Sequence, residues 1–327
     1  MPTRRRFLQS AVAGLAVTST AAAIDPIRRT GKSHIRLSIA GYSYRKYLEL
    51  KQKPKPPMNY DEFIDNAAAL DLDAVELTAY YFPETTPEYL AHLKGRCTRL
   101  GLDVSGTAVG NNFATSDPVK LKQQMKYVHD WVEHSARLGA KTVRIFAGQP
   151  DKGDSEEKAR ARCIEAIQES CDFAGKHGIY LALENHGGLV TTIDQMLGIV
   201  KAVKHDWFGV NFDTANFHSA DPYADLTQLA PYAVVVQLKT EIQRAGKKKE
   251  VADLPRLINI LRDAHYRGYV ALEYEADEEP KTAIPRAVEA LQKLAAKPRR
   301  FRHGPDLFHL PPSWPTALAS AAAFRSA

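Results

Sequence analysis

The chain has 327 residues, of which 44% are hydrophobic and 25% are charged, values typical of a globular protein with a sizeable core. Its formal net charge of +6 is concentrated at the two ends. Residues 1–23 and residues 298–327 each carry +3 and residues 24–31 carry +1, which leaves −1 for residues 32–297. A body without excess positive charge lacks the electrostatic footprint of a nucleic-acid-binding protein, so we expect no nucleic-acid partner.

The N-terminus places arginines ahead of an apolar run. The stretch T-R-R-R-F-L-Q (3–9) precedes a weakly apolar segment over 11–23 that ends in three alanines. This pattern resembles a twin-arginine signal peptide with an A-x-A cleavage site. The resemblance implies the twin-arginine export machinery as a partner, cleavage near Ala23, and a periplasmic or extracellular location. Because the apolar run is too short to span a hydrocarbon core of about 30 Å, we expect no stable membrane anchor. Residues 1–33 are therefore predicted to be a signal peptide and a short linker.

Short β-rich runs alternate with longer amphipathic segments over residues 34–297. The starts of the predicted strands lie about 33 residues apart on average, which is the size of one βα unit. The segments Pro118–Gly139 and Ser155–Gly178 have apolar residues at helical spacing. The predicted strands are Ile35–Ala40, Ala74–Leu77, Asp103–Ala108, Thr142–Ala147, Tyr180–Leu183, Phe208–Phe212, Val234–Leu238 and Tyr269–Leu272.

Glycines mark where the predicted helices give way to strands. Gly101, Gly139, Gly178 and Gly268 each come directly before or at the start of a strand, where glycine tolerates the left-handed conformation that closes a helix. Eight strands alternating with eight helices predict an α/β fold, a single-domain (β/α)8 TIM barrel over 34–297. The alternative is an open doubly wound sheet, but no G-x-G-x-x-G follows the first strand.

Polar side chains stand at the ends of four consecutive predicted strands: Glu184, Asp213, Gln237 and Glu273. In this fold the carboxyl ends of the strands meet at one mouth, where chemistry is built. Oxygen donors on rigid strands suit a divalent cation. The alternative for any single residue is that it caps the next helix, which is the ordinary use of acids at βα junctions. For four residues in register that alternative weakens, and a metal site is predicted.

The motifs L-E-N-H-G-G (183–188), F-D-T-A-N-F (212–217) and L-E-Y-E (272–275), with Gln237 and Lys239 between them, resemble the xylose isomerase-like TIM barrels. This is the sugar phosphate isomerase/epimerase superfamily, which includes ketose 3-epimerases, hydroxypyruvate isomerases and inosose dehydratases. The resemblance spans roughly residues 34–297. It implies that Glu184, Asp213, Gln237 and Glu273 bind one divalent metal, usually Mn²⁺, Mg²⁺ or Co²⁺.

Two departures from the family pattern bear on the metal and the substrate. Many members have histidine where Gln237 stands and aspartate where Thr240 stands. An amide oxygen makes the site harder, which favours Mn²⁺ or Mg²⁺ over Zn²⁺. Asn216 occupies a position where the sugar epimerases often carry histidine, which leaves the substrate open.

A metal that bridges the carbonyl and adjacent hydroxyl of a sugar acidifies the shared C–H and stabilises an enediolate. Glu184 and Glu273 would flank the substrate as the catalytic pair that removes and returns the proton. The predicted function is therefore a metal-dependent sugar isomerase or epimerase. The alternative is a lyase or dehydratase that eliminates from 3-keto-glycosides or related oxidised sugars in the same site.

Four further residues are predicted to touch the substrate. His186 lies two residues beyond Glu184 and Lys239 two beyond Gln237, so both share the strand-end direction, and Asn216 follows Asp213. Glu76 ends the second strand, where it contacts substrate or forms an ion pair with Arg144. The alternatives are a packed loop histidine and a solvated lysine.

The sequence gives two further indications about partners. Apurinic-site endonucleases of the same superfamily need additional histidines at early strand ends, where this chain has Ala40, Thr78 and Ala108. A small carbohydrate is therefore the expected substrate.

Residues 298–327 contain prolines and an alanine-rich end without a further βα unit, so we expect an irregular or disordered tail. Homo-oligomerisation is left open.

Overall fold

The computed structural model of the chain describes residues 24–50 and 56–296. The predicted signal peptide over 1–23 and the predicted tail over 298–327 lie outside the described residues. Residues 24–33 form neither helix nor strand, as expected of a linker. They nevertheless bond to the barrel, because Ile27 N donates to Pro231 O at 3.0 Å and Ser33 Oγ to Tyr266 O at 2.6 Å.

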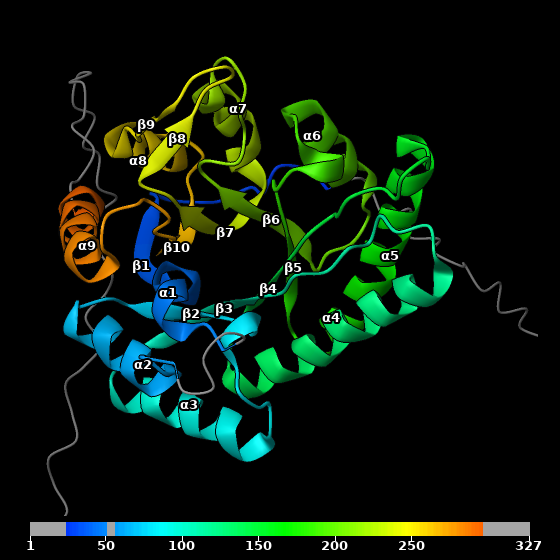
Figure 1. Cartoon of the computed structure of the whole chain (residues 1–327). Helices are drawn as coiled ribbons and strands as arrows, with labels where there is room; N and C mark the ends of the chain where they lie inside the picture. The colour runs from blue at the N-terminus through cyan, green and yellow to red at the C-terminus, as the bar shows by residue number, and fades with distance from the viewer. Residues whose placement is uncertain (1–23, 51–55, 297–327) are drawn as a thin grey trace, which may run out of the picture. The chain divides into compact units, whose positions relative to one another are not determined.

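Within residues 24–50 and 56–296, eight parallel strands form a closed barrel in the spatial order β1-β10-β7-β6-β5-β4-β3-β2 (Figure 1). Closure confirms the predicted (β/α)8 architecture and excludes an open doubly wound sheet. The strands are β1 (His34–Ala40), β2 (Ala74–Thr78), β3 (Asp103–Ala108), β4 (Thr142–Ile145), β5 (Tyr180–Glu184), β6 (Phe208–Asp213), β7 (Ala233–Leu238) and β10 (Arg267–Leu272).

Helices follow the strands in alternation and begin at capping side chains. Before each of α2 to α8 a side-chain oxygen accepts a hydrogen bond from a backbone N–H of the first turn. The capping residues are Asn59, Thr86, Asp117, Ser155, Thr192, Asp221 and Asp253. The helices are α1 (Arg45–Leu48), α2 (Tyr60–Ala69), α3 (Pro87–Arg99), α4 (Pro118–Leu138), α5 (Glu156–Lys176), α6 (Ile193–Ala202), α7 (Pro222–Leu229), α8 (Leu254–Asp263) and α9 (Pro280–Ala296). Short 3-10 turns cover Gly41–Tyr44, Ala79–Tyr81, Gly188–Val190 and Ala230–Tyr232.

The predicted helix-closing glycines are right at three positions and wrong at one. Gly101, Gly139 and Gly178 have φ values of 74°, 79° and 69°. Gly268 instead lies inside β10, and His265, with φ 52°, takes the left-handed conformation after α8. A side chain at position 268 would collide with the hydroxyl of Tyr266, so this glycine serves close packing rather than a helix end.

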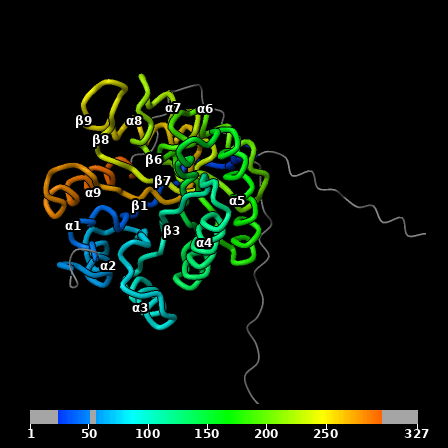
Figure 2. Tube along the Cα trace, turned by 45° about the vertical axis from the view of Figure 1, so that its right-hand side comes forward, coloured from blue at the N-terminus to red at the C-terminus, as the bar shows by residue number. Residues whose placement is uncertain are grey.

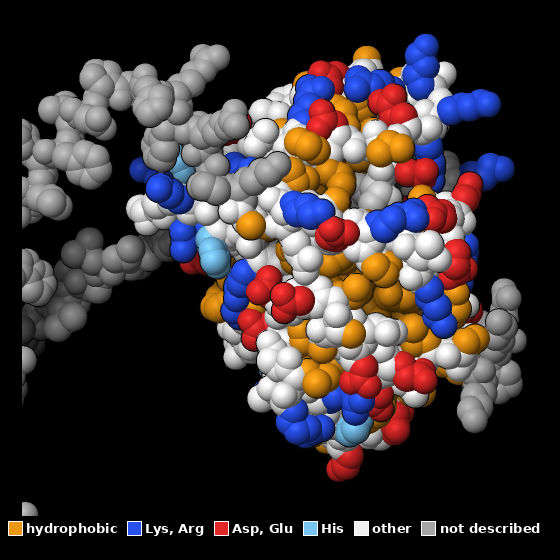
Figure 3. Space-filling view, turned by 90° about the vertical axis from the view of Figure 1, so that its left-hand side faces the viewer, with side chains coloured by type: hydrophobic (Ala, Val, Ile, Leu, Met, Phe, Trp, Pro, Cys, Tyr) orange, Lys and Arg blue, Asp and Glu red, His pale blue; other side chains and the backbone are white. Residues whose placement is uncertain are grey.

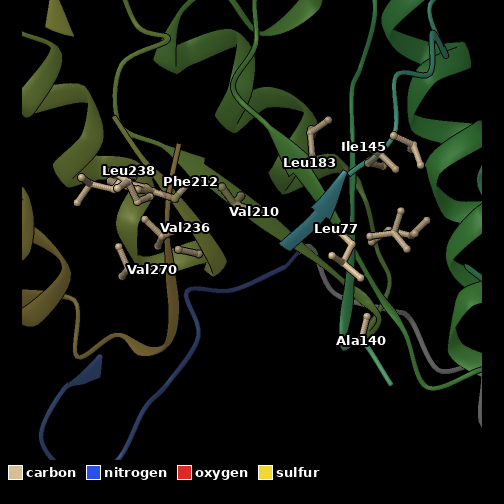
Figure 4. Close-up of a cluster of buried hydrophobic side chains, with 14 of the residues drawn as sticks. Leu77, Ala140, Ile145, Leu183, Val210, Phe212, Val236, Leu238 and Val270 are labelled. Atoms are coloured by element: carbon tan, nitrogen blue, oxygen red, sulfur yellow. The ribbon is translucent and has the colours of Figure 1, made fainter. Parts of the chain in front are cut away.

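Near their carboxyl ends, strands such as β2 (V-E-L-T) and β6 (V-N-F-D) alternate apolar and polar residues, and this alternation divides the core. Leu77, Leu183 and Phe212, which are among the buried side chains drawn in Figure 4, each directly neighbour a buried polar residue in sequence. Because successive side chains point to opposite faces of a strand, the apolar set and the polar set are separated. The apolar set packs in one cluster with helix residues such as Met125 and Val128. The polar side chains therefore face the inside of the barrel.

A small hairpin interrupts the pattern between β7 and α8. It consists of β8 (Glu241–Gln243) and β9 (Lys249–Val251), which pair antiparallel, and it lies beside α8 (Figure 1 and Figure 2). Lys247, Lys248 and Lys249 form its turn and the start of β9. The hairpin has no signal in the βα periodicity and was not predicted.

Charged side chains of both signs share the face that Figure 3 shows, and neither sign forms a large patch there. Arg286 on α9 and Glu278 just before it form an ion pair with Nη2 and Oε2 2.6 Å apart. The interspersed charges agree with the near-neutral body expected from the sequence. Among the described residues, every helix is too short or too polar to span a lipid bilayer.

The loop after β5 provides a test of backbone fit. Gly188 has φ 56°, and a Cβ at this position would overlap the carbonyl oxygen of Gly148. Gly178 has φ 69° but nothing within 4 Å of a Cβ. We expect Gly188→Ala to lower the free energy of unfolding by about 3 kcal/mol or more and Gly178→Ala by only about 1 kcal/mol, since the second adds φ strain without a clash. Urea denaturation measures both, and equal losses would contradict this account.

Candidate active site at the barrel mouth

A cluster of charged side chains is buried at the carboxyl ends of the strands. Each member is at most 6% exposed, although charged residues are rarely buried unless paired. The cluster consists of Glu76 on β2, Arg144 on β4, Glu184 on β5, Asp213 on β6, Lys239 after β7 and Glu273 after β10. The strand-end residues predicted from the sequence are therefore brought to one region, at the mouth of the barrel.

Helix capping does not account for the acids at the ends of β5 and β6. The side chains that cap α6 and α7 are Thr192 and Asp221. Asp213 accepts a hydrogen bond from Ala215 N at 2.8 Å, within its own loop, and Glu184 bonds only to side chains. Neither carboxylate therefore serves as the cap of the following helix.

Lys239 lies at the centre of the cluster. Its Nζ is 3.0 Å from Asp213 Oδ2, 3.3 Å from Glu273 Oε2 and 3.3 Å from Glu275 Oε2. It also donates to Asn216 Oδ1 at 3.2 Å. Burial alone would lower the pKa of this amine, but Asp213, Glu273 and Glu275 outweigh burial and hold the pKa well above its ordinary value. Lys239 is thus a buried ammonium inside a cage of oxygens, not a solvated loop lysine.

Strand register explains why Lys239, rather than Gln237, meets Glu273. Gln237 pairs with Asp213 on one side and with Ala271 on the other, so Glu273 lies two residues further along. Gln237 turns deeper into the barrel, where its Oε1 accepts from Asn211 Nδ2 at 2.7 Å and its Nε2 donates to Glu76 Oε1 at 2.9 Å. Of the four predicted metal ligands, Asp213 and Glu273 face one cation, whereas Glu184 and Gln237 have other partners.

Glu184 is held by one group on each oxygen. Arg144 Nε lies 3.0 Å from Oε2, and Asn216 Nδ2 donates to Oε1 at 2.8 Å. The ion pair considered between Arg144 and Glu76 is not formed; Arg144 pairs with Glu184 instead. Asn216 bridges Glu184 and Lys239, which places this predicted substrate residue inside the charged network.

Several residues of the site were missed by sequence reasoning. Asn185 makes two hydrogen bonds to the backbone of Asp213, donating to its oxygen and accepting from its nitrogen, both at 3.0 Å. Thr214 Oγ1 accepts from the backbone nitrogen of Lys239 at 2.8 Å. The contact of Glu275 with Lys239 was also missed, and Arg144 was considered only as a partner of Glu76. Arg144 had a detectable signal, because it is a charge within the short apolar strand T-V-R-I.

Burial shifts the pKa values of three acids of this cluster, Glu76, Glu184 and Asp213, toward neutrality. It raises the pKa of Glu184 to about 7 against the opposing effect of Arg144, and the pKa of Asp213 to about 7 against that of Lys239. It raises the pKa of Glu76 to about 8, and repulsion from Glu273 adds to this. Fully ionised, the buried acids Glu76, Glu184, Asp213 and Glu273 would exceed the buried cations Arg144 and Lys239 by two charges. Protons or a divalent cation would remove that excess.

The other predicted substrate residues occupy different depths. His186 is half-buried and packs on Phe146 with ring centroids 4.4 Å apart, and burial lowers the pKa of its imidazole. Glu76 is 1% exposed and bonds to Gln237, so it supports the barrel interior rather than lining the mouth. A cavity of about 190 Å³ opens beside Lys239 and Asn216 and extends to the β8–β9 hairpin.

Within residues 24–50 and 56–296, no group of three or more His, Cys, Asp or Glu side chains is arranged to hold a metal ion. Donor chemistry and charge nevertheless fit a hard divalent cation. Among the residues that the structure describes, Asp213 Oδ2 is buried without a hydrogen-bond partner and lies 3.0 Å from the ammonium of Lys239, and the cluster, if fully ionised, carries excess negative charge. The endonuclease alternative finds no support at the early strand ends, where Ala40, Thr78 and Ala108 are fully buried.

Comparisons with known proteins point to one family. The family model described as xylose isomerase-like TIM barrel matches residues 64–294. The chain is 23% identical over 152 residues to the 3-dehydroshikimate dehydratase of Bacillus anthracis, covering 46% of this chain and 52% of that enzyme, so it matches only about half of that relative's length. It is 20% identical over 194 residues to the L-ribulose-5-phosphate 3-epimerase UlaE of Salmonella paratyphi A, covering 57% of this chain and 68% of that enzyme.

A solved structure of the IolI protein with a bound zinc atom has the same fold. The TM-score is 0.62 at 18% identity, and the match covers 79% of this chain and 96% of that chain. At this identity the likeness is evidence for the fold alone.

Glu76 provides a test of the buried charge. Its folded-state pKa of about 8 lies above the ordinary value of 4.5, so the folded protein holds this proton more tightly than the unfolded chain does. The resulting stability is fully present below the unfolded pKa and is lost as the pH rises through the folded pKa. In metal-free protein we therefore expect the free energy of unfolding to fall by a few kcal/mol between about pH 5 and pH 8. Glu76→Gln should flatten that fall.

Urea denaturation at several pH values in the presence of a chelator measures the effect. Glu133→Gln, on the exposed face of α4, is the matched control and should keep the wild-type pH dependence. A Glu76→Gln profile that follows the wild type would show that Glu76 is already ionised in the folded state.

Proposed function

Because the chain belongs to the xylose isomerase-like TIM-barrel family, we propose that it is a divalent-metal-dependent sugar isomerase or epimerase that moves a proton through an enediolate. The observation that supports this most strongly is that Asp213 and Glu273 converge on one buried ammonium, that of Lys239, and that Asn216 links Glu184 to the same ammonium. The epimerase among the sequence relatives agrees with this class of reaction.

Glu184 and Glu273 would form the proton-transfer pair. A group that must both accept and return a proton works best with a pKa near the working pH, and burial brings Glu184 to about 7. Arg144 and Asn216 fix the orientation of Glu184 by contacting its two oxygens. Glu273 contacts Lys239, and Asn216 links Lys239 to Glu184, so the two acids are connected through the same lysine.

The resident metal would be Mn²⁺, Mg²⁺ or Co²⁺ in preference to Zn²⁺, held by Asp213, Glu273, Glu184 and the amide oxygen of Gln237. When bound, it would polarise the substrate carbonyl and the neighbouring hydroxyl as a Lewis acid. Gln237 Oε1 already accepts from Asn211 and keeps a second lone pair for a cation. Asn185 hydrogen-bonds to the backbone of Asp213, and Thr214 accepts a hydrogen bond from the backbone nitrogen of Lys239, so both fix the backbone next to the proposed ligands.

The substrate would be a neutral sugar or a sugar acid bound at the mouth. Asn216 and Lys239 face the cavity of about 190 Å³ and offer an amide and an ammonium to hydroxyl or carboxylate groups. His186 is held on Phe146 by ring packing and offers an imidazole that its lowered pKa keeps neutral. We further propose export by the twin-arginine route, with the mature chain starting near Ile24.

A second candidate is elimination in the same site. The relative from Bacillus anthracis is a dehydratase, and an acid that removes a proton next to a carbonyl can lead to loss of a neighbouring group as readily as to proton return. A 3-keto-glycoside or related oxidised sugar would be the substrate of such a lyase or dehydratase.

Proton exchange tests the proposed base. Protein supplied with Mn²⁺ and a panel of ketoses in D₂O should place deuterium at one carbon of the accepted sugar, observed by NMR. Glu184→Gln removes the base and should slow this exchange by about 10²-fold or more. Glu165→Gln, exposed on α5, is the matched control and should exchange like the wild type.

Mass spectrometry of products from 3-keto-glycosides separates the two candidates, because loss of water or of the aglycone shows elimination. An unchanged exchange rate in Glu184→Gln would remove Glu184 from the proton-transfer pair.

A further inference from the structure

Lys239 occupies a site built for a cation. Four oxygen atoms surround its ammonium at 3.0 to 3.3 Å, from Asp213, Asn216, Glu273 and Glu275. Asp213 Oδ2 has no hydrogen-bond donor other than this ion-pair partner. The positive charge of Lys239 therefore neutralises negative charge on the carboxylates of this cage of oxygen atoms.

The same lysine borders open space. The cavity of about 190 Å³ is lined by Lys239, Asn216 and Glu275 and continues to Glu241 and Lys249 on the β8–β9 hairpin. Two of the four oxygens around the ammonium, those of Asn216 and Glu275, thus face the cavity as well as the cage. Glu275 is 30% exposed at its side chain, whereas Asp213 is fully buried. Lys239 could leave Asp213 and Glu273 and still keep two partners.

We propose that Lys239 is an internal counter-ion that competes with the divalent cation for Asp213 and Glu273, and that it moves toward Glu275 and the cavity when that cation binds. The inference rests on the proposed function, because it concerns the metal of the same site. Two cations a few ångströms apart in a buried site repel each other strongly, so the ammonium and the metal cannot share the same two carboxylates. The lysine neutralises the metal-free cage and thereby weakens metal binding.

Calorimetric titration of the full chain with MnCl₂ tests this directly. Lys239→Met keeps the length and apolar stem of the side chain and removes the competing charge, so we expect Mn²⁺ to bind at least about tenfold more tightly than to the wild type. Lys249→Met is the matched control, because this lysine lines the same cavity but pairs with Glu241 at 4.0 Å rather than with the cage. Its Mn²⁺ affinity should stay within about twofold of the wild type.

Glu275→Gln separates competition from simple charge effects. This change removes the partner that receives the displaced ammonium, so it should weaken Mn²⁺ binding in the wild-type background. In the Lys239→Met background the same change should have much less effect, because no ammonium has to be received. Equal effects in both backgrounds would mean that Glu275 acts on the metal independently of Lys239, which overturns the proposed movement.

Thermal unfolding with and without MnCl₂ checks that the variants fold. Metal-free Lys239→Met should melt below the wild type, since its carboxylates lack a counter-ion, and should gain more from Mn²⁺. If Lys239→Met does not fold, Lys239→Gln, which keeps hydrogen-bonding capacity, is titrated under the same criterion.

Equal Mn²⁺ affinity of wild type and Lys239 variants would overturn this inference and leave the proposed metal dependence standing. Absence of Mn²⁺ binding in all of them would overturn both. Binding only in the Lys239 variants would support the competition and show that the wild-type site relies on its own ammonium.

Discussion

The mouth of the barrel depends on the neutralisation of buried negative charge. Glu184, Asp213 and Glu273 are placed where water is largely excluded, and the ammonium of Lys239 and the guanidinium of Arg144 make this placement tolerable. Burial of carboxylates next to one another is costly, and the raised pKa values of Glu184 and Asp213 report that cost. Such a cluster contributes little to folding, and buried acids with shifted pKa values are typical of functional sites.

The charged cluster can exist only because the rest of the barrel is conventional. Apolar residues on the outward positions of β5, β6 and β7, such as Leu183, Phe212 and Val236, pack in one continuous core. Capping side chains such as Thr192 and Asp221 start the helices without drawing on the strand-end acids. The hydrogen bonds of Asn185 to the backbone of Asp213 then fix the distance between two neighbouring strand ends. On the same strands, the apolar side chains stabilise the fold and the polar side chains form the candidate site.

Periodicity allowed most of the fold to be predicted, because alternation of strands and helices is a local property of the sequence. The strand ends at Glu184 and Asp213 were predicted to within a residue for the same reason. Register is not local, and the sequence offered no means to see that Glu273 aligns with Lys239 rather than with Gln237. The pairing of Arg144 with Glu184 also depends on two strands whose relation only the closed barrel defines. The β8–β9 hairpin was missed because an insertion leaves the βα period intact on either side.

Charged side chains are distributed unevenly around the barrel mouth, and this distribution limits the chemistry that the site can support. Most of the charged groups gather on β4 to β7 and β10, with Glu76 on β2 as the exception, whereas the last residues of β1, β2 and β3 are Ala40, Thr78 and Ala108. A site that must hold several metal ions needs ligands from around the whole mouth, and these three described strand ends have no imidazole or carboxylate at their last residue. The cavity of about 190 Å³ opens on the side of these late strand ends, next to Lys239 and Asn216. Under the proposed function, a single metal ion beside two carboxylates would act as a Lewis acid while the carboxylates move protons next to a carbonyl, and this chemistry is common to sugar isomerisation, epimerisation and elimination.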